Sequence, residues 1–348
     1  MINIKDKFEI SDSTYHYTVG YYTANKWIGN DIIIASRSKH QRVFASEAEV
    51  ELVKISLTTG EQTILCNDVS NYMGYVVYKN FVYYTTGKEI KKIDTVTGEI
   101  TVIYKNTLFT DIENPDFFNP EITNDGNFLS VYVRQQNKPT SFIVVDLKNG
   151  TAKILFEKSF SDPFPEASHG MICPTDPEIM FFVHEGDTRY ITNRLWIYNA
   201  KTNEMYNVAK QKLDENGILG DCFGHEAWAP DGKGMYFVKY PVSPVPPKGI
   251  CYVDIATRDV KLLYSGFPYW HVGSSPDNKY LLADTYEDPC RVVVIDKSDH
   301  TETVIDAVNI LTYHPGHPHA QMSPDGKTVI YTAVNDNGMV CIKGARLV

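Results

Sequence analysis

The chain has 348 residues, a formal net charge of −10 at pH 7, 43 % hydrophobic residues and 22 % charged residues. This composition is ordinary for a globular protein, and the acidity argues against a general nucleic-acid binder, which needs a basic stripe. The N-terminal sequence is charged, no apolar run reaches membrane-spanning length, and the six scattered cysteines include no Cys-x-x-Cys pair. We therefore expect a cytoplasmic protein with reduced thiols and no membrane or nucleic-acid partner.

A turn centred on Asp or Asn, followed by a β-rich run, recurs seven times along the chain at intervals of 45 to 55 residues. The turn residues are Asp31, Asn80, Asp125, Asp176, Asp231, Asp277 and Asp325. A second polar turn between two short strands follows in most of these units, which gives about four strands per unit. Repeats of this kind predict an all-β protein, a seven-bladed β-propeller with four-stranded antiparallel blades.

We expect one propeller domain over residues 1–348, with blades near 20–68, 69–106, 119–158, 169–210, 222–265, 269–307 and 314–348. The seventh unit lacks its second hairpin, so its outer strand must come from elsewhere. Tyr15–Val19 is the predicted closing strand, paired with Met339–Lys343, because closure by an N-terminal strand removes exposed sheet edges. Two separate β-sandwiches are the alternative, but they would not explain the even period.

Histidines recur at one place in the repeat. His225, His271 and His319 each lie six residues before the turn aspartate of their unit, and His169 lies seven residues before its own. This position falls on or just before the innermost strand of each blade. Four consecutive blades are therefore expected to present a histidine beside the central channel, which independent core histidines would not do.

The densest group of histidines lies in Tyr313–Lys327, YHPGHPHAQMSPDGK, and comprises His314, His317 and His319. Prolines follow the first two and favour extended geometry there, so the segment is predicted to be an exposed strand edge that presents imidazoles. Clustered imidazoles are the usual ligands of a borderline divalent metal. A polar loop is the plainer interpretation, but three histidines within six residues favour a metal site.

The second strand of each blade returns to the face where the histidines lie. This adds His184 and Arg194 in the fourth blade and Lys239 in the fifth, although Lys239 can equally be a solvated side chain. Aromatic residues such as Trp270 lie at the same rim, as sugar-stacking platforms would. The candidate substrate-binding residues are therefore His169, His184, Trp270, Tyr22 and Lys239.

Four stretches of the sequence resemble the oligogalacturonate lyases. They are VHEGDTRYITNRLW (183–196), CFGHEAWAPDGKGMYFVKY (222–240), YWHVGSSPDNKYLLADT (269–285) and HPHAQMSPDGKTVIYTA (317–333). The resemblance implies a seven-bladed propeller that binds a divalent metal, with Mn²⁺ the expected ion, and that cleaves unsaturated digalacturonate by β-elimination. It implies His271, His317 and His319 as metal ligands, with His314 at a ligand position where the family has glutamine.

The resemblance covers the last half of the chain well and the first three blades only as architecture. The chain lacks the histidine that the family tends to carry beside Tyr21 and Tyr22, and it is rather short for the family. These departures concern the exact substrate more than the type of reaction.

Elimination from a uronate removes the proton at C5, beside the carboxylate, and expels the oxygen at C4. A divalent metal on the carboxylate would offset the developing charge, and a base must lie near C5. Arginine almost always stays charged, so the residues favour His225 as the base and Arg194 as a carboxylate clamp. The resemblance keeps Arg194 as the second candidate for the base.

The expected function is therefore a metal-dependent lyase that acts on short, unsaturated oligogalacturonides. A lyase of the same fold acting on a different uronide is one alternative. A non-catalytic TolB-like propeller that serves as a binding module is another. The sequence indicates no oligomeric state.

Overall fold

The computed structural model describes residues 2–41, 49–112, 115–135 and 138–348. Every regular element among these residues is a β-strand, and the strands form seven antiparallel sheets with four strands in each main path. Within the same residues no helix is long and apolar enough to cross a membrane. The seven-bladed β-propeller with four-stranded blades that the repeat predicted is thus confirmed.

Contacts between Cα atoms divide the chain into two compact units, residues 1–103 with 273–348, and residues 104–272. The boundaries run through β10 (Ile100–Lys105) and β23 (Tyr269–Ser274). Each of these strands belongs to a sheet whose other strands lie in the first unit.

Apart from the end of β10 and most of β23, four sheets lie in the first unit. The first sheet contains β2 (His16–Thr18), β4 (Ile32–Ser38), β5 (Glu51–Ser56) and β6 (Gln62–Cys66), with β3 (Trp27–Ile28) also paired to β4. The second contains β7 (Tyr75–Tyr78), β8 (Phe81–Thr85), β9 (Glu89–Asp94) and β10. The sixth contains β23, β24 (Tyr280–Thr285), β25 (Cys290–Asp296) and β26 (Thr301–Val308). The seventh contains β27 (Gln321–Met322), β28 (Thr328–Val334), β29 (Val340–Leu347) and β1 (Ile4–Ile10).

The second unit holds the third, fourth and fifth sheets. The third contains β11 (Phe117–Ile122), β12 (Phe128–Val133), β13 (Thr140–Asp146) and β14 (Thr151–Lys158). The fourth contains β15 (Ala167–Cys173), β16 (Asp176–His184), β17 (Leu195–Asn199) and β18 (Glu204–Asn207). The fifth contains β19 (Phe223–Trp228), β20 (Gly234–Lys239), β21 (Gly249–Asp254) and β22 (Val260–Tyr264).

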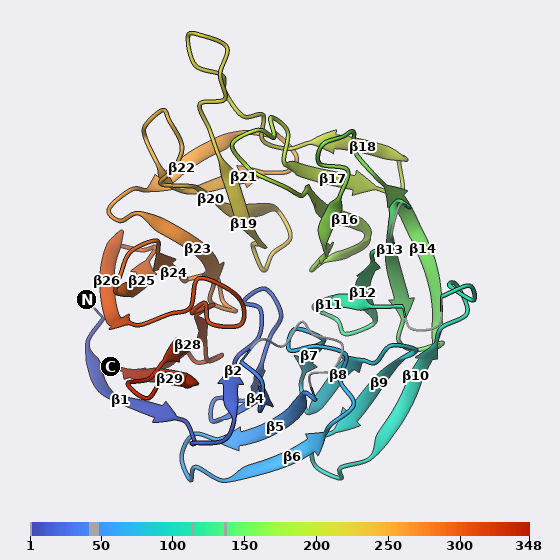
Figure 1. Ribbon diagram of the computed structural model, residues 1–348, viewed down its shortest axis with the longest axis vertical. Helices are drawn as coiled ribbons and strands as arrows, with labels where there is room; N and C mark the ends of the chain where they lie inside the picture. The colour runs from blue at the N-terminus through green and yellow to red at the C-terminus, as the bar shows by residue number, and fades with distance from the viewer. Residues whose placement is uncertain (1, 42–48, 113–114, 136–137) are drawn as a thin grey trace. The chain divides into compact units, whose positions relative to one another are not determined.

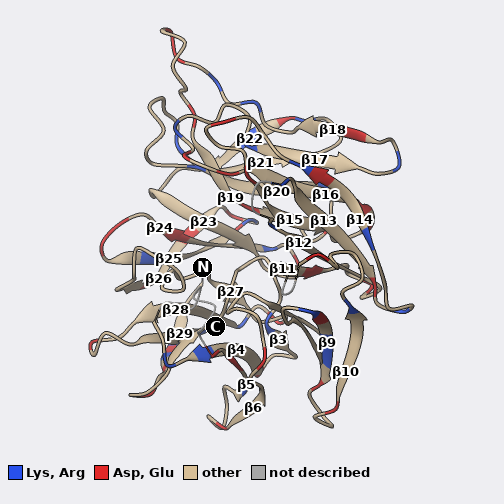
Figure 2. Cartoon of the chain, turned by 45° about the vertical axis from the view of Figure 1, so that its right-hand side comes forward, with Lys and Arg blue, Asp and Glu red and all other residues tan. Residues whose placement is uncertain are grey.

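Burial follows strand order within each sheet of the second unit. The outermost strands β14, β18 and β22 are mostly exposed or half-buried, and charged residues occur along them and in the loops beside them (Figure 2). Every residue of β20 is buried. The fourth and fifth sheets pack face to face through apolar side chains that include Phe181, Leu195 and Phe237, and this burial stabilises the unit.

The recurrent turns are closed by their own side chains. In the seventh sheet the Ser323 hydroxyl bonds to the Asp325 carboxylate at 2.7 Å, and that carboxylate accepts from the Lys327 amide at 3.1 Å. Ser275 and Asp277 repeat the first contact in the sixth sheet, also at 2.7 Å. Because Ser and Asp side chains hold such turns locally, the repeat could be read directly from the sequence.

An N-terminal strand completes the seventh sheet, as expected, but the predicted residues were wrong. β1 pairs with β29 from Ile4 opposite Leu347 to Ile10 opposite Ile342, at the outer edge of the sheet (Figure 1). Tyr15–Val19 instead contributes β2, which pairs with β4 of the first sheet. Tyr17 and Val19 are buried in the core beside that sheet, whereas β1 is largely exposed, and exposure suits an outermost strand.

Candidate active site

The shared register of the histidines corresponds to a repeated irregularity of the innermost strands. Asn119, His169, His225 and His319 all have positive φ angles, between 43° and 52°. The pairing register shifts at this point in β11, β15 and β19. Left-handed backbone is costly for residues other than glycine, so its recurrence marks a position under geometric constraint. Such bulges redirect side chains out of the alternation of a strand, and they concentrate near functional sites.

The segment before β27 is buried, so the prediction of an exposed strand edge was wrong. β27 begins only at Gln321, and the side chains of His317 and His319 are 6 % and 1 % exposed. Pro318 has no amide proton for a ladder, and the left-handed backbone of His319 ends the extended run. The ring of His314 lies 4.1 Å from that of His317 and 5.2 Å from that of His319, measured between centroids.

The first sheet surrounds His319 with tyrosines because its innermost strand is interrupted between β2 and β3. The residues of this interruption include Tyr21 and Tyr22, whose ring centroids lie 4.9 and 5.4 Å from that of His319. Nδ1 of His319 lies 3.0 Å from the Gly20 carbonyl oxygen. A carbonyl can only accept, so Nδ1 carries the proton and the neutral ring has its lone pair on Nε2. Tyr22 thus lies beside a candidate metal ligand.

Three of the four predicted metal ligands, His271, His317 and His319, are buried, and His314 is half-buried. In the first unit the ring centroids of His317 and His319 lie 5.7 Å apart. His271 stands on β23 of the sixth sheet. Burial lowers the pKa of His317, although the charge of Asp284 acts against the shift. Neutral imidazoles bind metal ions, so this donor set fits a borderline divalent cation.

His225 lies directly against a predicted ligand. Its ring centroid is 3.8 Å from that of His271, and its Nδ1 lies 2.5 Å from the Trp270 carbonyl oxygen. As in His319, this contact places the proton on Nδ1 and the lone pair of the neutral ring on Nε2. The Trp270 ring is half-buried, with its centroid 4.5 Å from that of His271. The contact with the carbonyl therefore fixes the orientation of the His225 ring next to His271 and Trp270.

Arg194 is held between two carboxylates. Its Nε donates to Glu226 Oε1 and its Nη1 donates to Glu185 Oε1, both at 3.3 Å, and Nη1 also donates to the His184 carbonyl at 3.1 Å. The guanidinium is 3 % exposed. Burial by itself would lower the pKa of Arg194, but the charges of Glu185 and Glu226 raise it above its ordinary value. Arg194 therefore keeps its proton.

The same two carboxylates flank His169. Nε2 of His169 lies 3.5 Å from Glu185 Oε2, and Nδ1 lies 3.6 Å from Glu226 Oε2. Burial opposes ionisation of both acids, but Arg194 and His169 outweigh it and lower the pKa values of Glu185 and Glu226. Glu226 was not among the predicted site residues, although it lies next to His225 in the sequence HEAW, and that adjacency was the signal from which it could have been found.

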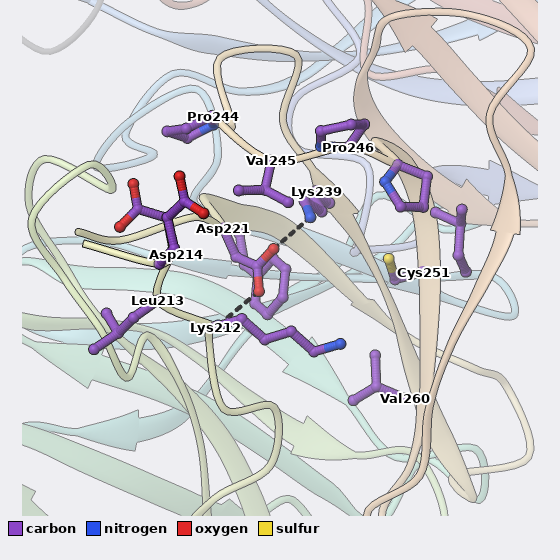
Figure 3. Close-up of a pocket in the computed structure, with 14 residues that line it drawn as sticks. Lys212, Leu213, Asp214, Asp221, Lys239, Pro244, Val245, Pro246, Cys251 and Val260 are labelled. Carbon is purple, nitrogen blue, oxygen red and sulfur yellow. Dashed lines mark hydrogen bonds and ion pairs between the residues drawn. The ribbon is translucent and has the colours of Figure 1, made fainter. Parts of the chain in front are cut away.

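Two predicted substrate-binding residues lie in other surroundings. His184 is stacked on Phe160 with centroids 3.8 Å apart, and its Nε2 lies 2.7 Å from the Phe164 carbonyl oxygen. Lys239 forms a buried ion pair with Asp221, whose other oxygen accepts from the Lys212 amide at 2.6 Å (Figure 3). This pair lines a cavity of about 680 Å³ together with the apolar side chains of Phe223 and Val245.

The described geometry therefore provides three kinds of group. Buried imidazoles are of the type that holds a cation, the imidazole of His225 is of the type that accepts a proton, and Arg194 supplies a fixed positive charge. These are the requirements for removing a proton next to a carboxylate.

Comparison of the sequence with curated proteins identifies two relatives with similar descriptions. An oligogalacturonate lyase of Dickeya dadantii (strain 3937) is 24 % identical over 215 residues, which cover 55 % of this chain and 51 % of the relative. An oligogalacturonide lyase of Pectobacterium atrosepticum is 25 % identical over 213 residues, with the same coverage of 55 % and 51 %. The chain spans about half the length of the curated relatives it matches.

Solved structures show the same fold over almost the whole chain. An oligogalacturonate lyase in complex with manganese has a TM-score of 0.79 at 17 % identity, covering 100 % of this chain and 98 % of its own. An oligogalacturonate lyase from Vibrio parahaemolyticus has a TM-score of 0.75 at 16 % identity, with coverage of 99 % and 98 %. TolB from Acinetobacter baumannii gives 0.50 at 13 % identity, with coverage of 90 % and 80 %.

The sequence model of the family described as oligogalacturonate lyase matches residues 83–311, which is more than half of the chain. The fold, the histidine register and this match agree, and the chain belongs to the oligogalacturonate lyase family.

Proposed function

We propose that this protein is a metal-dependent lyase that cleaves short, unsaturated oligogalacturonides by β-elimination. The observation that carries the proposal is the burial of the imidazoles: His317 and His319 lie together in the first unit, and His225 lies against His271 in the second. A non-catalytic binding module would need neither a convergent ligand set nor a base beside it. Family membership supports the choice of substrate.

The cation would be held by His271, His317 and His319, with His314 at the margin of the group. A divalent cation bound there would draw electron density from the uronate carboxylate and so acidify the proton at C5. Mn²⁺ is the proposed ion, because the manganese complex of an oligogalacturonate lyase has the same fold. Imidazole donors alone would also accept other borderline ions.

His225 is the proposed base. Its Nδ1 donates to the Trp270 carbonyl, so Nε2 can take the C5 proton while the ring stays fixed in orientation. Trp270 offers an apolar face to the sugar ring, and Tyr22 lines the region beside His319. Arg194 keeps its proton and contributes positive charge, which makes the alternative assignment as base unfavourable.

The test is turnover of unsaturated digalacturonate by purified protein with Mn²⁺, followed by the loss of the unsaturated-uronate absorbance. A chelator-treated sample should be inactive and should recover on addition of Mn²⁺. The variant His225→Gln should keep the metal and lose turnover by about 10²–10⁴-fold. If the metal-loaded wild type turns over no substrate, the proposal is refuted. If it cleaves an unsaturated disaccharide of a different uronate but not digalacturonate, that uronate is the substrate.

A further inference from the structure

β-Elimination moves two protons, and the residues considered so far account for one. His225 takes the proton from C5, but the oxygen that leaves C4 departs as an alkoxide unless a group protonates it. A general acid for this step must lie close to the base and must be protonated near neutral pH. A tyrosine hydroxyl meets the second condition, because its ordinary pKa is about 10.

Tyr240 meets the first condition. It follows the end of β20, and its ring lies edge-on to that of His225, with the centroids 5.2 Å apart and the planes at 77°. Its hydroxyl reaches over Gly224, the residue before His225, so closely that a methyl group on Gly224 would collide with it. The glycine therefore leaves the space that the hydroxyl occupies beside the base.

Backbone hydrogen bonds fix Tyr240 in this place. Its amide donates to the Cys222 carbonyl at 2.8 Å, and its carbonyl accepts from the Ser243 amide at 3.0 Å. The anchoring carbonyl belongs to the chain that leads directly into β19 and His225. The base thus stands on β19 and the acid directly follows β20, the strand that pairs with β19, which places the two side chains side by side.

Arg194 provides the electrostatic support that a phenolic acid needs. The charge of a Tyr240 phenolate is among the groups that raise the pKa of Arg194, after Glu185 and Glu226. The interaction is mutual, since a nearby cation favours the anionic form that remains after a phenol has given its proton. A permanently charged arginine is therefore useful in this site without being the base.

We propose that Tyr240 is the general acid of the elimination; this assignment rests on the proposed function. His225 Nε2 accepts the C5 proton, and the C5–H electron pair forms the C4=C5 double bond as the C4–O4 bond breaks. The departing oxygen takes the Tyr240 hydroxyl proton and leaves as an alcohol. The phenolate and the imidazolium then exchange a proton, directly or through water, which restores both groups without any oxidant or co-reactant.

The test compares two leaving groups in the variant Tyr240→Phe, which keeps the ring and its packing. On unsaturated digalacturonate, kcat should fall by about 10²–10⁴-fold with bound Mn²⁺ and thermal stability unchanged. On a galacturonide that carries a 2,4-dinitrophenoxy group at C4, kcat should change little. The leaving group is then 2,4-dinitrophenolate, a stable anion that needs no proton to depart. Tyr198→Phe, which removes a hydroxyl on β17 that contacts Asn203, is the matched control and should equal the wild type on both substrates.

Equal losses on both substrates, or no loss on the natural one, would overturn the assignment while the lyase function stands. His225→Gln distinguishes the two steps, since it should fail on both substrates. A wild type inactive on both with Mn²⁺ bound would instead overturn the proposed function, and the assignment of Tyr240 with it.

Discussion

The histidines of the first unit and those near Arg194 in the second unit lie in different electrostatic surroundings. His317 and His319 are packed among imidazole and tyrosine rings, and burial keeps the first of them neutral. His169 lies between two carboxylates that also hold a buried guanidinium. The same residue type at the same repeat position can therefore serve as a neutral ligand in one place and as part of a charged network in another. The neighbours decide the role.

The largest effect is expected from removing members of the neutral cluster, the buried imidazoles His271, His317 and His319 that we propose as ligands. In the double variant His317→Ala/His319→Ala, two of these three proposed ligands are lost, so bound metal and turnover should both fall below detection. Elemental analysis of protein incubated with Mn²⁺ and then desalted measures this. His184→Ala is the matched control, because that ring is engaged with Phe160 and Phe164, and it should retain the metal. Full occupancy in the double variant would contradict the ligand assignment.

The charged cluster consists of Arg194, His169, Glu185 and Glu226. Removing its guanidinium should lower the stability of the fold. Arg194→Gln leaves Glu226 buried without its guanidinium partner, which should lower the free energy of unfolding by about 3–5 kcal/mol. Urea denaturation measures the change. Adding Glu226→Gln to that variant should restore part of the loss, because the uncompensated charge is then gone.

The same variant tests the role of Arg194 in turnover. Because Arg194 keeps its proton, its loss should raise KM more than it lowers kcat. A stable Arg194→Gln variant with a collapsed kcat and an unchanged KM would instead identify the arginine as the base, and His225 would lose that role.

The charged cluster also predicts a pH dependence of stability. The pKa values of Glu185 and Glu226 lie below 4.5 in the folded protein, although burial opposes this, because Arg194 and His169 favour the ionised forms. Their contribution to stability should therefore be complete above about pH 4.5, the unfolded value, and be lost as the pH falls below it. Thermal unfolding between pH 7 and pH 3 checks this, and the decline should be shallower in Arg194→Gln. A steeper decline in that variant would be incompatible with the ion pairs described.

The smallest effect is expected at the margin of the neutral cluster. His314 is half-buried, whereas the other three proposed ligands are buried, so His314→Gln should keep the bound metal and change its affinity by no more than about tenfold. Competition between Mn²⁺ and Zn²⁺, followed by elemental analysis, measures any change in preference. Complete loss of metal would show that His314 is a full ligand, which would enlarge the neutral cluster from three members to four.

Much of the architecture follows from local sequence signals. The Ser-Pro-Asp-Gly turns close through their own side chains, so the spacing of these turns along the chain is enough to count seven blades. The common register of His225 and His319 is also found in the structure, since both residues have a left-handed backbone. At His225 this backbone belongs to a bulge in the innermost strand. By contrast, Tyr15–Val19 and Ile4–Ile10 are both short β-prone runs, and only burial in the assembled sheets separates the inner strand from the outer one.

The sequence by itself determined the repeat, the number of blades and the residue types that could hold a metal, since these depend on spacing and on side-chain chemistry. The tertiary structure decided which candidates meet. It stacked His225 against His271, engaged His184 with a neighbouring loop, and paired Lys239 with Asp221. It also brought Glu226 and Tyr240 beside Arg194 and His225, because side-chain direction at a bulge and reach across adjacent strands depend on packing that no spacing in the chain encodes.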